Sequence, residues 1–331
     1  MLNPFERLRV PPKVEDFIEI QARRLSSIGG KTVKEREIRR LKNYRDGLNA
    51  YLTFVRSFPK VDDLHPFYRT SLEIESGSLD RVKVCLSEIK KNAELARRIL
   101  QQYEDLIRRN DEMEANKLMR SGFGRASSIL RRSENCLSWL IKVVKELSME
   151  RAIDPYMPTV IVSGPPNVGK STLVSAISSA KPEVASYPFT TKEIHVGHMD
   201  CGIKVQVIDT PGILDRPDYK RNVIERRAVN ALKNLQGLII FLFDVSKSAN
   251  YDPEEQLKIF NDVKTLGKPI VVVFNKIDDV DNEIRGEIIS KINDRPLEIS
   301  SEKRIGLNLI RREIFKWLKS ISQDPSAVLD C

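Results

Sequence analysis

The chain has 331 residues, enough for two domains of roughly 150 residues each, and this length excludes a small fold that depends on disulfides or metals. With 41% hydrophobic and 31% charged residues, the composition excludes a disordered or membrane-embedded chain. The formal charge of +9 argues against an acidic surface and indicates an acidic partner.

Three features of the sequence indicate the cellular compartment of the protein. The four cysteines lie at least 51 residues apart without a CxxC pair, so we expect a reducing compartment and neither a disulfide framework nor a zinc ribbon. No apolar run approaches the roughly 20 residues that span a bilayer, and residues 1–10 lack the apolar core of a secretory signal. We therefore predict a complete, cytoplasmic protein that does not contact a membrane.

Residues 1–155 show only helical patterns. A helix is predicted over 14–24. Thr32 and Glu35 form a capping box in which each side chain is expected to bond the other residue's backbone N–H, and this box begins the next helix.

Two longer helices follow. Apolar residues recur with 4-3-4-3 spacing over 82–107 and again over 119–147. We predict two helices of roughly 30 residues, joined around Asn110 and Asp111, that pair as a long antiparallel coiled-coil hairpin. The first half is therefore expected to be an all-α helical bundle.

The pattern changes after Pro155 and Pro158, which interrupt the helical period. Strands are expected at 159–163, 204–208, 238–243, 270–274 and 296–299, and helices at 170–179, 221–235, 253–266, 281–289 and 306–321. This alternation predicts a mostly parallel sheet with helices on both faces. We expect a helical domain at 1–155, an α/β domain at 156–322 and a short tail at 323–331.

The clearest motif is a phosphate-binding loop between a predicted strand and a predicted helix. It matches GxxxxGK[ST] and comprises Gly164, Pro165, Pro166, Asn167, Val168, Gly169, Lys170 and Ser171, with Thr172 following. Glycines let the backbone N–H groups of such a loop point at phosphate oxygens, beside the positive end of the helix dipole. Lys170 is expected to bridge the β and γ phosphates, and the Ser171 hydroxyl to coordinate Mg²⁺.

A second motif, Asp209-Thr210-Pro211-Gly212, follows the strand expected at 204–208. An acid at the end of a neighbouring strand can reach Mg²⁺, usually through water, so Asp209 is a candidate for this role. The Gly212 N–H can bond the γ phosphate and sense its loss.

A third motif, Asn275-Lys276-Ile277-Asp278, follows the strand expected at 270–274. The Asp278 carboxylate can accept two adjacent N–H donors of guanine, a pair that adenine lacks, and Asn275 and Lys276 are expected to bond and cover the base. After the last strand, a turn formed by Ser300, Ser301 and Glu302 can offer a backbone N–H to guanine. The alternative is a turn without a role in binding, which is the usual case for such residues.

Between the first two motifs, Phe189, Thr190 and Thr191 lie in a stretch suited to a switch that closes on Mg²⁺ and the γ phosphate. By chemistry alone, either threonine could be the ligand. With all four motifs in order, the second domain resembles a P-loop GTPase of the TRAFAC class, in the Obg-related group whose first switch reads YPFTT. The resemblance implies GTP as substrate and Thr191 as the Mg²⁺ ligand.

Two positions bear on mechanism. Ile213 stands where Ras-like GTPases hold the Gln that orients the attacking water. Asn167 matches the loop Asn that coordinates K⁺ in cation-dependent relatives, which implies a K⁺ that neutralises transition-state charge. The alternative is that Asn167 only hydrogen-bonds within the loop. The residues with expected catalytic roles are Lys170, Thr191, Gly212 and Asn167.

The positive charge lies in the first half, where 31 Lys and Arg face 23 Asp and Glu, against 24 and 23 in residues 156–331. Two clusters are candidates for RNA phosphates: Arg23, Arg24, Lys31, Lys34, Arg36, Arg39, Arg40, Lys42 and Arg45, and then Arg120, Arg125, Arg131 and Arg132. The alternative is the solvated face of a stable helix.

A closer resemblance rests on residues 58–68 (FPKVDDLHPFY), on the helix before them and on residues 209–215 (DTPGILD). These segments are similar to the nucleolar GTP-binding protein family. The resemblance implies a monomeric GTPase of a short archaeal type that assembles the large ribosomal subunit through rRNA contacts of its helical domain. Its turnover is expected to be slow alone and stimulated by K⁺ and ribosomal particles. The alternative is a guanine-nucleotide-dependent binding scaffold with little turnover.

His195, His198 and Cys201 superficially offer three metal ligands. Strand alternation places the two histidines on opposite faces of a strand. We therefore predict that these residues are structural.

Overall fold

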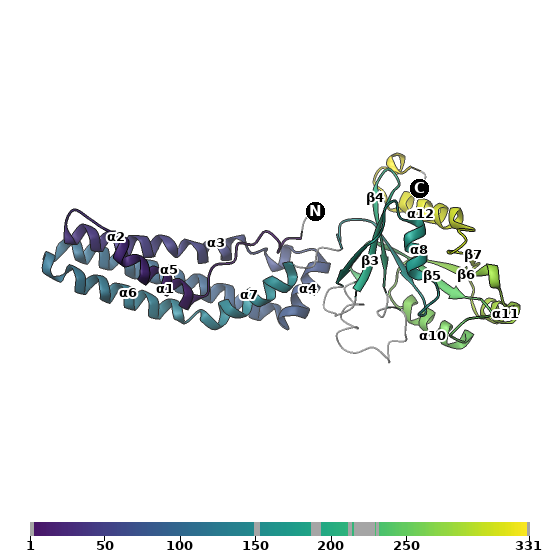
Figure 1. Cartoon of the computed structure of the whole chain (residues 1–331), viewed down its shortest axis with the longest axis horizontal. Coiled ribbons are helices and arrows are strands. Elements are labelled where there is room, and N and C mark those ends of the chain that lie inside the picture. Colours follow the sequence, from purple (N-terminus) through teal and green to yellow (C-terminus); the bar gives the residue numbers. More distant parts are fainter. Residues whose placement is uncertain are drawn as a thin grey trace. The chain divides into compact units, whose positions relative to one another are not determined.

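Two units make up the computed structural model, which describes residues 3–148, 153–186, 193–210, 214, 229 and 232–329 (Figure 1). The helical unit contains residues 3–64 and 72–148, and the α/β unit combines residues 65–71 with the described residues from 153 onward. Helix α4, Pro66–Ser76, therefore begins in the α/β unit, where Asn234 Nδ2 donates to Thr70 Oγ1 at 3.1 Å. The predicted boundary at residue 155 placed residues 65–71 in the helical domain instead.

The helical unit is organised around α5, Leu79–Arg109, a helix of 31 residues. The other helices are α1 Val14–Arg24, α2 Val33–Gly47, α3 Asn49–Ser57, α6 Ala115–Arg131 and α7 Glu134–Ser148. α2, α3, α6 and α7 all contact α5. At the start of α2, Thr32 Oγ1 accepts the predicted bond from Glu35 N at 3.1 Å, but the Glu35 carboxylate accepts from Lys31 N instead of Thr32 N.

The single helix predicted over 119–147 is wrong, because the chain breaks into α6 and α7 at Arg132 and Ser133. Ser133 directly precedes α7, the N-cap position at which serine is favoured. Its buried hydroxyl accepts a hydrogen bond from Asn92 Nδ2 of α5 at 2.9 Å. A polar partner in the core thus fixes a break that the apolar period does not show.

The expectation of a chain without disulfides is also wrong. Cys85 of α5 and Cys136 of α7 form a disulfide, with Cα atoms 5.1 Å apart. Cys201 of the α/β unit is disulfide-bonded as well. The spacing of 51 residues gave no sign of the first bridge because the chain leaves along α5 and returns along α6 and α7.

The α/β unit contains a seven-stranded sheet in the order β2-β3-β4-β1-β5-β6-β7. The strands are β1 Thr159–Ser163, β2 Glu183–Ser186, β3 Glu193–Asp200, β4 Lys204–Asp209, β5 Gly237–Asp244, β6 Ile270–Asn275 and β7 Leu297–Glu298. From β4 to β7 all neighbours are parallel, whereas β2, β3 and β4 pair antiparallel. The mostly parallel sheet predicted from the sequence is confirmed.

Helices cover both faces of this sheet (Figure 1): α8 Lys170–Ile177, α10 Pro253–Lys264, α11 Asn282–Lys291 and α12 Leu307–Ile321. On one face, α8 and α12 bury leucines and isoleucines against β1, β4 and β5. On the other face, Phe260 of α10 packs against Phe241 and Phe243, with ring centroids 5.0 and 5.3 Å apart. Most of the helix expected at 221–235 lies outside the described residues.

Candidate nucleotide-binding site

The phosphate loop connects β1 to α8 and requires unusual backbone angles. Gly164 has φ 143°, and a Cβ there would collide with the Leu242 carbonyl oxygen. Gly169 has φ 98° at the N-cap of α8, and Asn167 has φ 63°, in the left-handed region that asparagine tolerates better than most residues. These positions explain why glycines stand at both ends of the loop.

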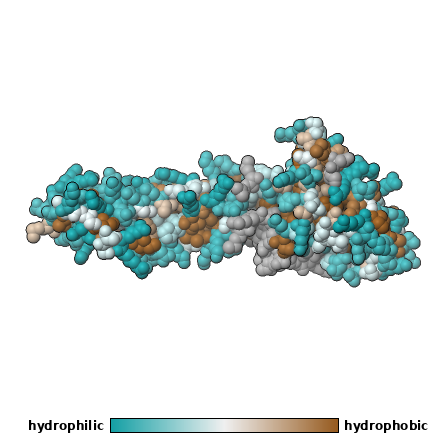
Figure 2. Space-filling view, turned by 45° about the horizontal axis from the view of Figure 1, so that its top comes forward, coloured by the Kyte–Doolittle hydropathy of each residue, from teal (hydrophilic) through white to brown (hydrophobic). Residues whose placement is uncertain are grey.

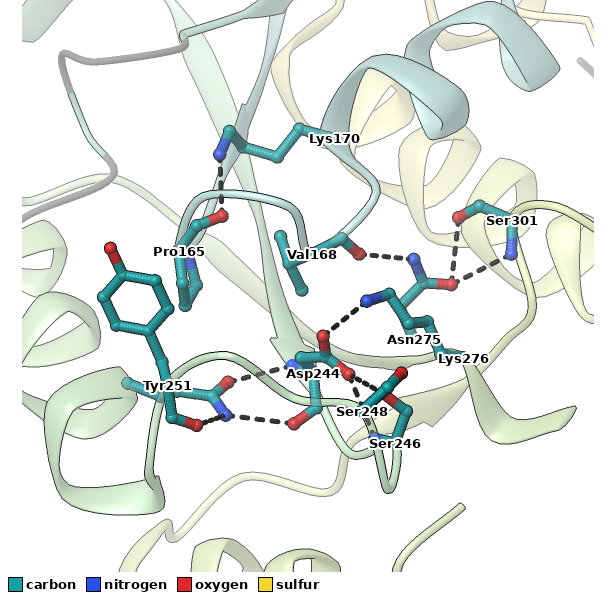
Figure 3. A network of polar contacts seen from close by, with 11 residues as sticks. Pro165, Val168, Lys170, Asp244, Ser246, Ser248, Tyr251, Asn275, Lys276 and Ser301 are labelled. Carbon is teal, nitrogen blue, oxygen red and sulfur yellow. Dashed lines mark hydrogen bonds and ion pairs between the residues drawn. The ribbon is translucent and has the colours of Figure 1, made fainter. Parts of the chain in front are cut away.

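Lys170 is folded inward over this loop. Its side chain is buried, and Nζ donates to the carbonyl oxygens of Gly164 at 3.0 Å and Pro165 at 2.8 Å. Figure 3 shows the ammonium group reaching across the loop to Pro165. The loop thus has a fixed cation at its centre, next to the N-terminus of α8, where anions are favoured.

Asn275 joins the phosphate loop to the turn after β7. Its Nδ2 donates to the Val168 carbonyl at 2.7 Å, and its Oδ1 accepts from Ser301 N and Oγ at 2.9 and 3.0 Å (Figure 3). The side chain is 2% exposed. Asn275 thus clamps two loops together, and its amide nitrogen carries a second N–H, so the bond to a base stays a prediction.

Lys276 lies in a left-handed conformation, with φ 62°, and its Nζ is 2.6 Å from Asp244 Oδ2. Asp244 ends β5 and is buried, and its other oxygen accepts from Ser246 N and Oγ. Sequence reasoning missed Asp244. It ends a buried strand just as Asp209 and Asn275 do, and this shared position could have found it.

Asp278 is paired with a residue outside the predicted set. Lys303 Nζ lies 3.1 Å from Asp278 Oδ2. Hydrogen bonding from the Ser300 hydroxyl, and then from Lys303, holds the pKa of Asp278 below its usual range. The carboxylate is therefore ionised at neutral pH and can accept hydrogen bonds from a ligand.

These groups surround a cavity of about 390 Å³, within the size range of small-molecule sites. Asn167, Thr172 and Glu302 line it together with Asn275, Lys276 and Asp278. Ser246 and Ser248, which follow β5, complete the wall. Four segments that are distant in sequence thus converge at the ends of parallel strands, where ligands bind in such sheets.

Ser171 and Asp209 lie together beside the phosphate loop. Ser171 Oγ donates to Asp209 Oδ2 at 2.5 Å, and Asp209 is fully buried. A hydroxyl and a carboxylate are hard oxygen ligands of the kind that Mg²⁺ prefers, so the pair fits the expected cation. The remaining predicted ligands lie outside the described residues: Phe189, Thr190, Thr191 and Gly212.

His195 and His198, which the sequence analysis predicted to be structural residues and not metal ligands, have different surroundings. Within the described part of the chain, no three side chains of His, Cys, Asp or Glu form a metal-binding group. His198 is exposed. His195 Nδ1, in contrast, lies 3.6 Å from Asp209 Oδ2, a proximity that strand alternation did not predict.

The surface of the helical unit is largely hydrophilic (Figure 2). The basic residues predicted to bind RNA all belong to this unit and divide into two groups. Six form ion pairs with acids of the same unit: Arg23, Arg36, Arg39, Arg40, Arg45 and Arg131. Seven form no ion pair with another described residue: Arg24, Lys31, Lys34, Lys42, Arg120, Arg125 and Arg132. Fewer charges are thus available to a partner than the sequence suggests.

Three of the ion pairs neutralise two buried acids. The Glu37 carboxylate, 0% exposed, lies 3.0 Å from Arg40 and 2.8 Å from Arg36. Glu104, 4% exposed, lies 3.2 Å from Arg45. Because a buried carboxylate needs a charge partner, these arginines serve the helical fold.

Comparison with known proteins places both units in one family. The protein-family model described as NOG1 N-terminal helical domain matches residues 5–154, and the family model described as 50S ribosome-binding GTPase matches residues 159–276. Nucleolar GTP-binding protein 1 of Drosophila melanogaster is 33% identical over 98% of this chain and 53% of its own length. The chain belongs to the nucleolar GTP-binding protein family. This result confirms the predicted family and the P-loop GTPase fold of the second domain.

Two further proteins are similar to this chain. An uncharacterised protein of Methanocaldococcus jannaschii is 40% identical over 68% of this chain and 63% of its own length. A crystal structure of nucleolar GTP-binding protein 1 from Plasmodium falciparum is 33% identical, covers 51% of this chain and 90% of its own, and has a TM-score of 0.45. The chain spans less than two thirds of both the Drosophila and the Methanocaldococcus protein.

The predicted cytoplasmic location is wrong for this family. Relatives from Drosophila, Caenorhabditis and Arabidopsis are named nucleolar proteins, which indicates the nucleolus in eukaryotes, and the archaeal relative gives no indication of location. Among the described residues, no helix is long and apolar enough to cross a membrane.

Proposed function

We propose that this protein binds and hydrolyses GTP and acts as a nucleotide-dependent switch in assembly of the large ribosomal subunit, with its helical unit against rRNA. One observation carries the nucleotide part of the proposal. The phosphate loop, the motif from Asn275 to Asp278 and the Ser301 turn line one cavity, and Asp209 accepts a hydrogen bond from Ser171 next to the phosphate loop. This arrangement supports a nucleotide site in which the loop meets the phosphates, Ser171 and Asp209 meet the cation, and the motif from Asn275 to Asp278 meets the base.

Guanine selectivity follows from Asp278. Its carboxylate is ionised and lines the cavity, so it can accept both the N1–H and the 2-amino group of guanine. Adenine offers no such pair of donors and would leave the carboxylate without its partners. A site built around a hydrogen bond rejects an analogue that lacks it by up to about 10⁴-fold to 10⁵-fold.

On the phosphate side, Lys170 and the N-terminus of α8 provide positive charge, and Ser171 and Asp209 would hold Mg²⁺. When bound, the cation supplies charge neutralisation at the β and γ phosphates. Thr191 and Gly212 complete the proposed switch, with Thr191 toward Mg²⁺ and Gly212 toward the γ phosphate.

K⁺ is a further part of the proposal. Asn167 lines the cavity and lies in a left-handed turn of the phosphate loop, and Ile213 cannot orient an attacking water. A K⁺ held by Asn167 would supply charge stabilisation that is worth about 10³-fold to 10⁵-fold in rate when an arginine supplies it. GTP turnover in KCl and NaCl at equal ionic strength tests this role. Equal rates in the two salts would remove K⁺ from the mechanism, and an Asn167→Ala variant that keeps the K⁺ response would show that Asn167 does not hold the ion.

The ribosomal part is supported by the matching model described as a 50S ribosome-binding GTPase and by the basic helical unit. The seven basic residues without ion pairs are the proposed partners of RNA phosphates. Removing Lys42 or Arg120, both exposed, should weaken RNA binding and lower the salt slope of log Kd by about 0.7 to 0.9 for each neutralised phosphate. Arg39→Ala is the matched control, since this arginine already pairs with Glu35. Equal weakening of RNA binding in all three variants would contradict the assignment.

One experiment tests the function as a whole. Fluorescent GDP should bind the full chain, GTP should displace it and ATP should not, and Asp278→Asn should shift the preference toward xanthine nucleotides. Isolated large ribosomal subunits should then stimulate GTP hydrolysis in KCl. Unchanged GTP affinity in Asp278→Asn would refute the base assignment. Guanine nucleotide binding without any stimulated hydrolysis would favour the alternative, a binding scaffold with little turnover.

A further inference from the structure

His195 stands on the strand next to the proposed cation site. β3 and β4 run antiparallel, and Val196 is paired with Ile208, so His195 and Asp209 are the next residues along the two strands. The distance from His195 Nδ1 to Asp209 Oδ2 is 3.6 Å. The side chain of His195 is 38% exposed, whereas that of Asp209 is completely buried.

The imidazole is oriented with one nitrogen inward. Its Nδ1 atom is buried and has no hydrogen-bond partner within the described part of the chain. A buried polar atom without a partner costs about 1–3 kcal/mol, which makes this orientation unfavourable for a residue that only fills space. The 3.6 Å contact is longer than a hydrogen bond, but a small approach would let Nδ1–H donate to the carboxylate.

The same carboxylate oxygen has a second neighbour. Ser171 Oγ, at the start of α8, donates to Asp209 Oδ2 at 2.5 Å. Oδ2 is therefore near both a hydroxyl from the phosphate loop helix and an imidazole from β3. Outer-shell partners of metal sites orient the groups that meet the ion, and their loss typically lowers metal affinity by about 10-fold to 100-fold.

We propose that His195 is a positioning residue for the divalent cation: it holds the Asp209 carboxylate in the orientation in which that group meets Mg²⁺. This inference rests on the proposed function, because it assumes a nucleotide-bound Mg²⁺ beside Ser171 and Asp209. His195 contributes to retention of the cation and leaves the base pocket and the phosphate loop unchanged.

Dissociation of fluorescent GDP from the full chain tests this role without any measurement of hydrolysis. The rate is followed in EDTA and across a Mg²⁺ titration for wild type, His195→Leu and His195→Asn. The amide nitrogen of Asn and the Nδ1 atom of His are each bonded to Cγ, so the His195→Asn variant keeps a hydrogen-bond donor at this position. His198→Leu is the matched control, since His198 lies on the same strand and is exposed.

In His195→Leu, we expect about 10-fold to 100-fold more Mg²⁺ to be needed to slow GDP release, with the rate in EDTA within about twofold of wild type. His195→Asn should recover most of this loss, and His198→Leu should behave as wild type. An unchanged Mg²⁺ titration in His195→Leu would overturn the inference, and so would an equal change in EDTA, which would show a general disturbance of the site. Wild-type protein that binds no GDP in either condition would overturn the proposed function and this inference with it.

Discussion

The ammonium group of Lys276 lies 2.6 Å from the carboxylate of Asp244, a buried acid that two bonds from Ser246 hold in place. Lys276 and Asp244 stand at the ends of neighbouring parallel strands, β6 and β5. The pair fixes the direction of a long side chain that would otherwise sample many rotamers. A nucleotide base that packs on Lys276 therefore meets a surface that is already ordered.

Asp244→Asn should weaken GDP binding about tenfold, because a hydrogen bond to a charged group contributes about 1.5–3 kcal/mol and the amide keeps only part of it. Isothermal titration of GDP measures the change, and the thermal midpoint shows whether the fold is intact. Asp294→Asn is the control, since it breaks an exposed pair with Lys264 outside the cavity. Equal GDP affinities in the two variants would show that the Lys276 contact does not matter for binding.

Arg40→Met should destabilise the protein by about 1–3 kcal/mol, because the Glu37 carboxylate, 0% exposed, loses its hydrogen bonds from Arg40 and keeps Arg36. Arg39→Met removes an exposed pair with Glu35 and should cost less than about 1 kcal/mol. Urea unfolding followed by circular dichroism compares the two variants. Similar losses of stability would mean that Glu37 does not depend on Arg40.

Two glycines of α6 should respond to alanine in opposite directions. A Cβ on Gly122 would lie 2.8 Å from Tyr103 Cβ, whereas a Cβ on Gly124 would meet nothing within 4 Å. Gly122→Ala should therefore destabilise the protein by about 1–3 kcal/mol through overpacking. Gly124→Ala should stabilise it by up to about 1 kcal/mol through helix propensity. Thermal unfolding of both variants checks the signs, and a stabilising Gly122→Ala would contradict the packing of α5 on α6.

Removal of the Cys85–Cys136 disulfide should lower the free energy of unfolding by about 2–4 kcal/mol, the usual effect of releasing a long loop in the unfolded chain. Cys85→Ala with Cys136→Ala makes this change without altering the rest of the chain. Thermal unfolding of wild type should also shift downward in dithiothreitol, and the double variant should lack the shift that this bridge contributes. A thermal midpoint in the double variant equal to that of wild type in oxidising buffer would contradict the prediction.

Local sequence signals predicted the fold and most of the candidate site. The phosphate loop and the motif at Asn275 were predictable because each depends on a short run of residues at the end of a strand. Asp244 and Lys303 were missed because their roles arise only when other segments of the chain pack beside them. The disulfide and the break at Ser133 have the same origin, since both are set by contacts with α5.

The basic residues show the opposite case: the sequence counts every positive charge, including those that folding pairs with acids of the same unit. Charge density in the sequence made nine basic residues between 23 and 45 candidates for RNA phosphates. Folding pairs Arg36 and Arg40 with the interior acid Glu37, and Arg45 with Glu104. A count of charges in the sequence does not separate buried acids from exposed ones. It could therefore not show which arginines form ion pairs with buried acids.

The bridge between α5 and α7 also closes a covalent ring that contains all of α6 and the exposed turn at Met113. A protease that cuts this turn would open the ring at one point but would release no fragment, because the two pieces stay joined through sulfur. Nicked protein would therefore migrate as an intact chain on a denaturing gel until a reductant is added. In an oxidising environment, damage at this exposed turn of the helical unit would be tolerated, and the cut chain would stay in one piece.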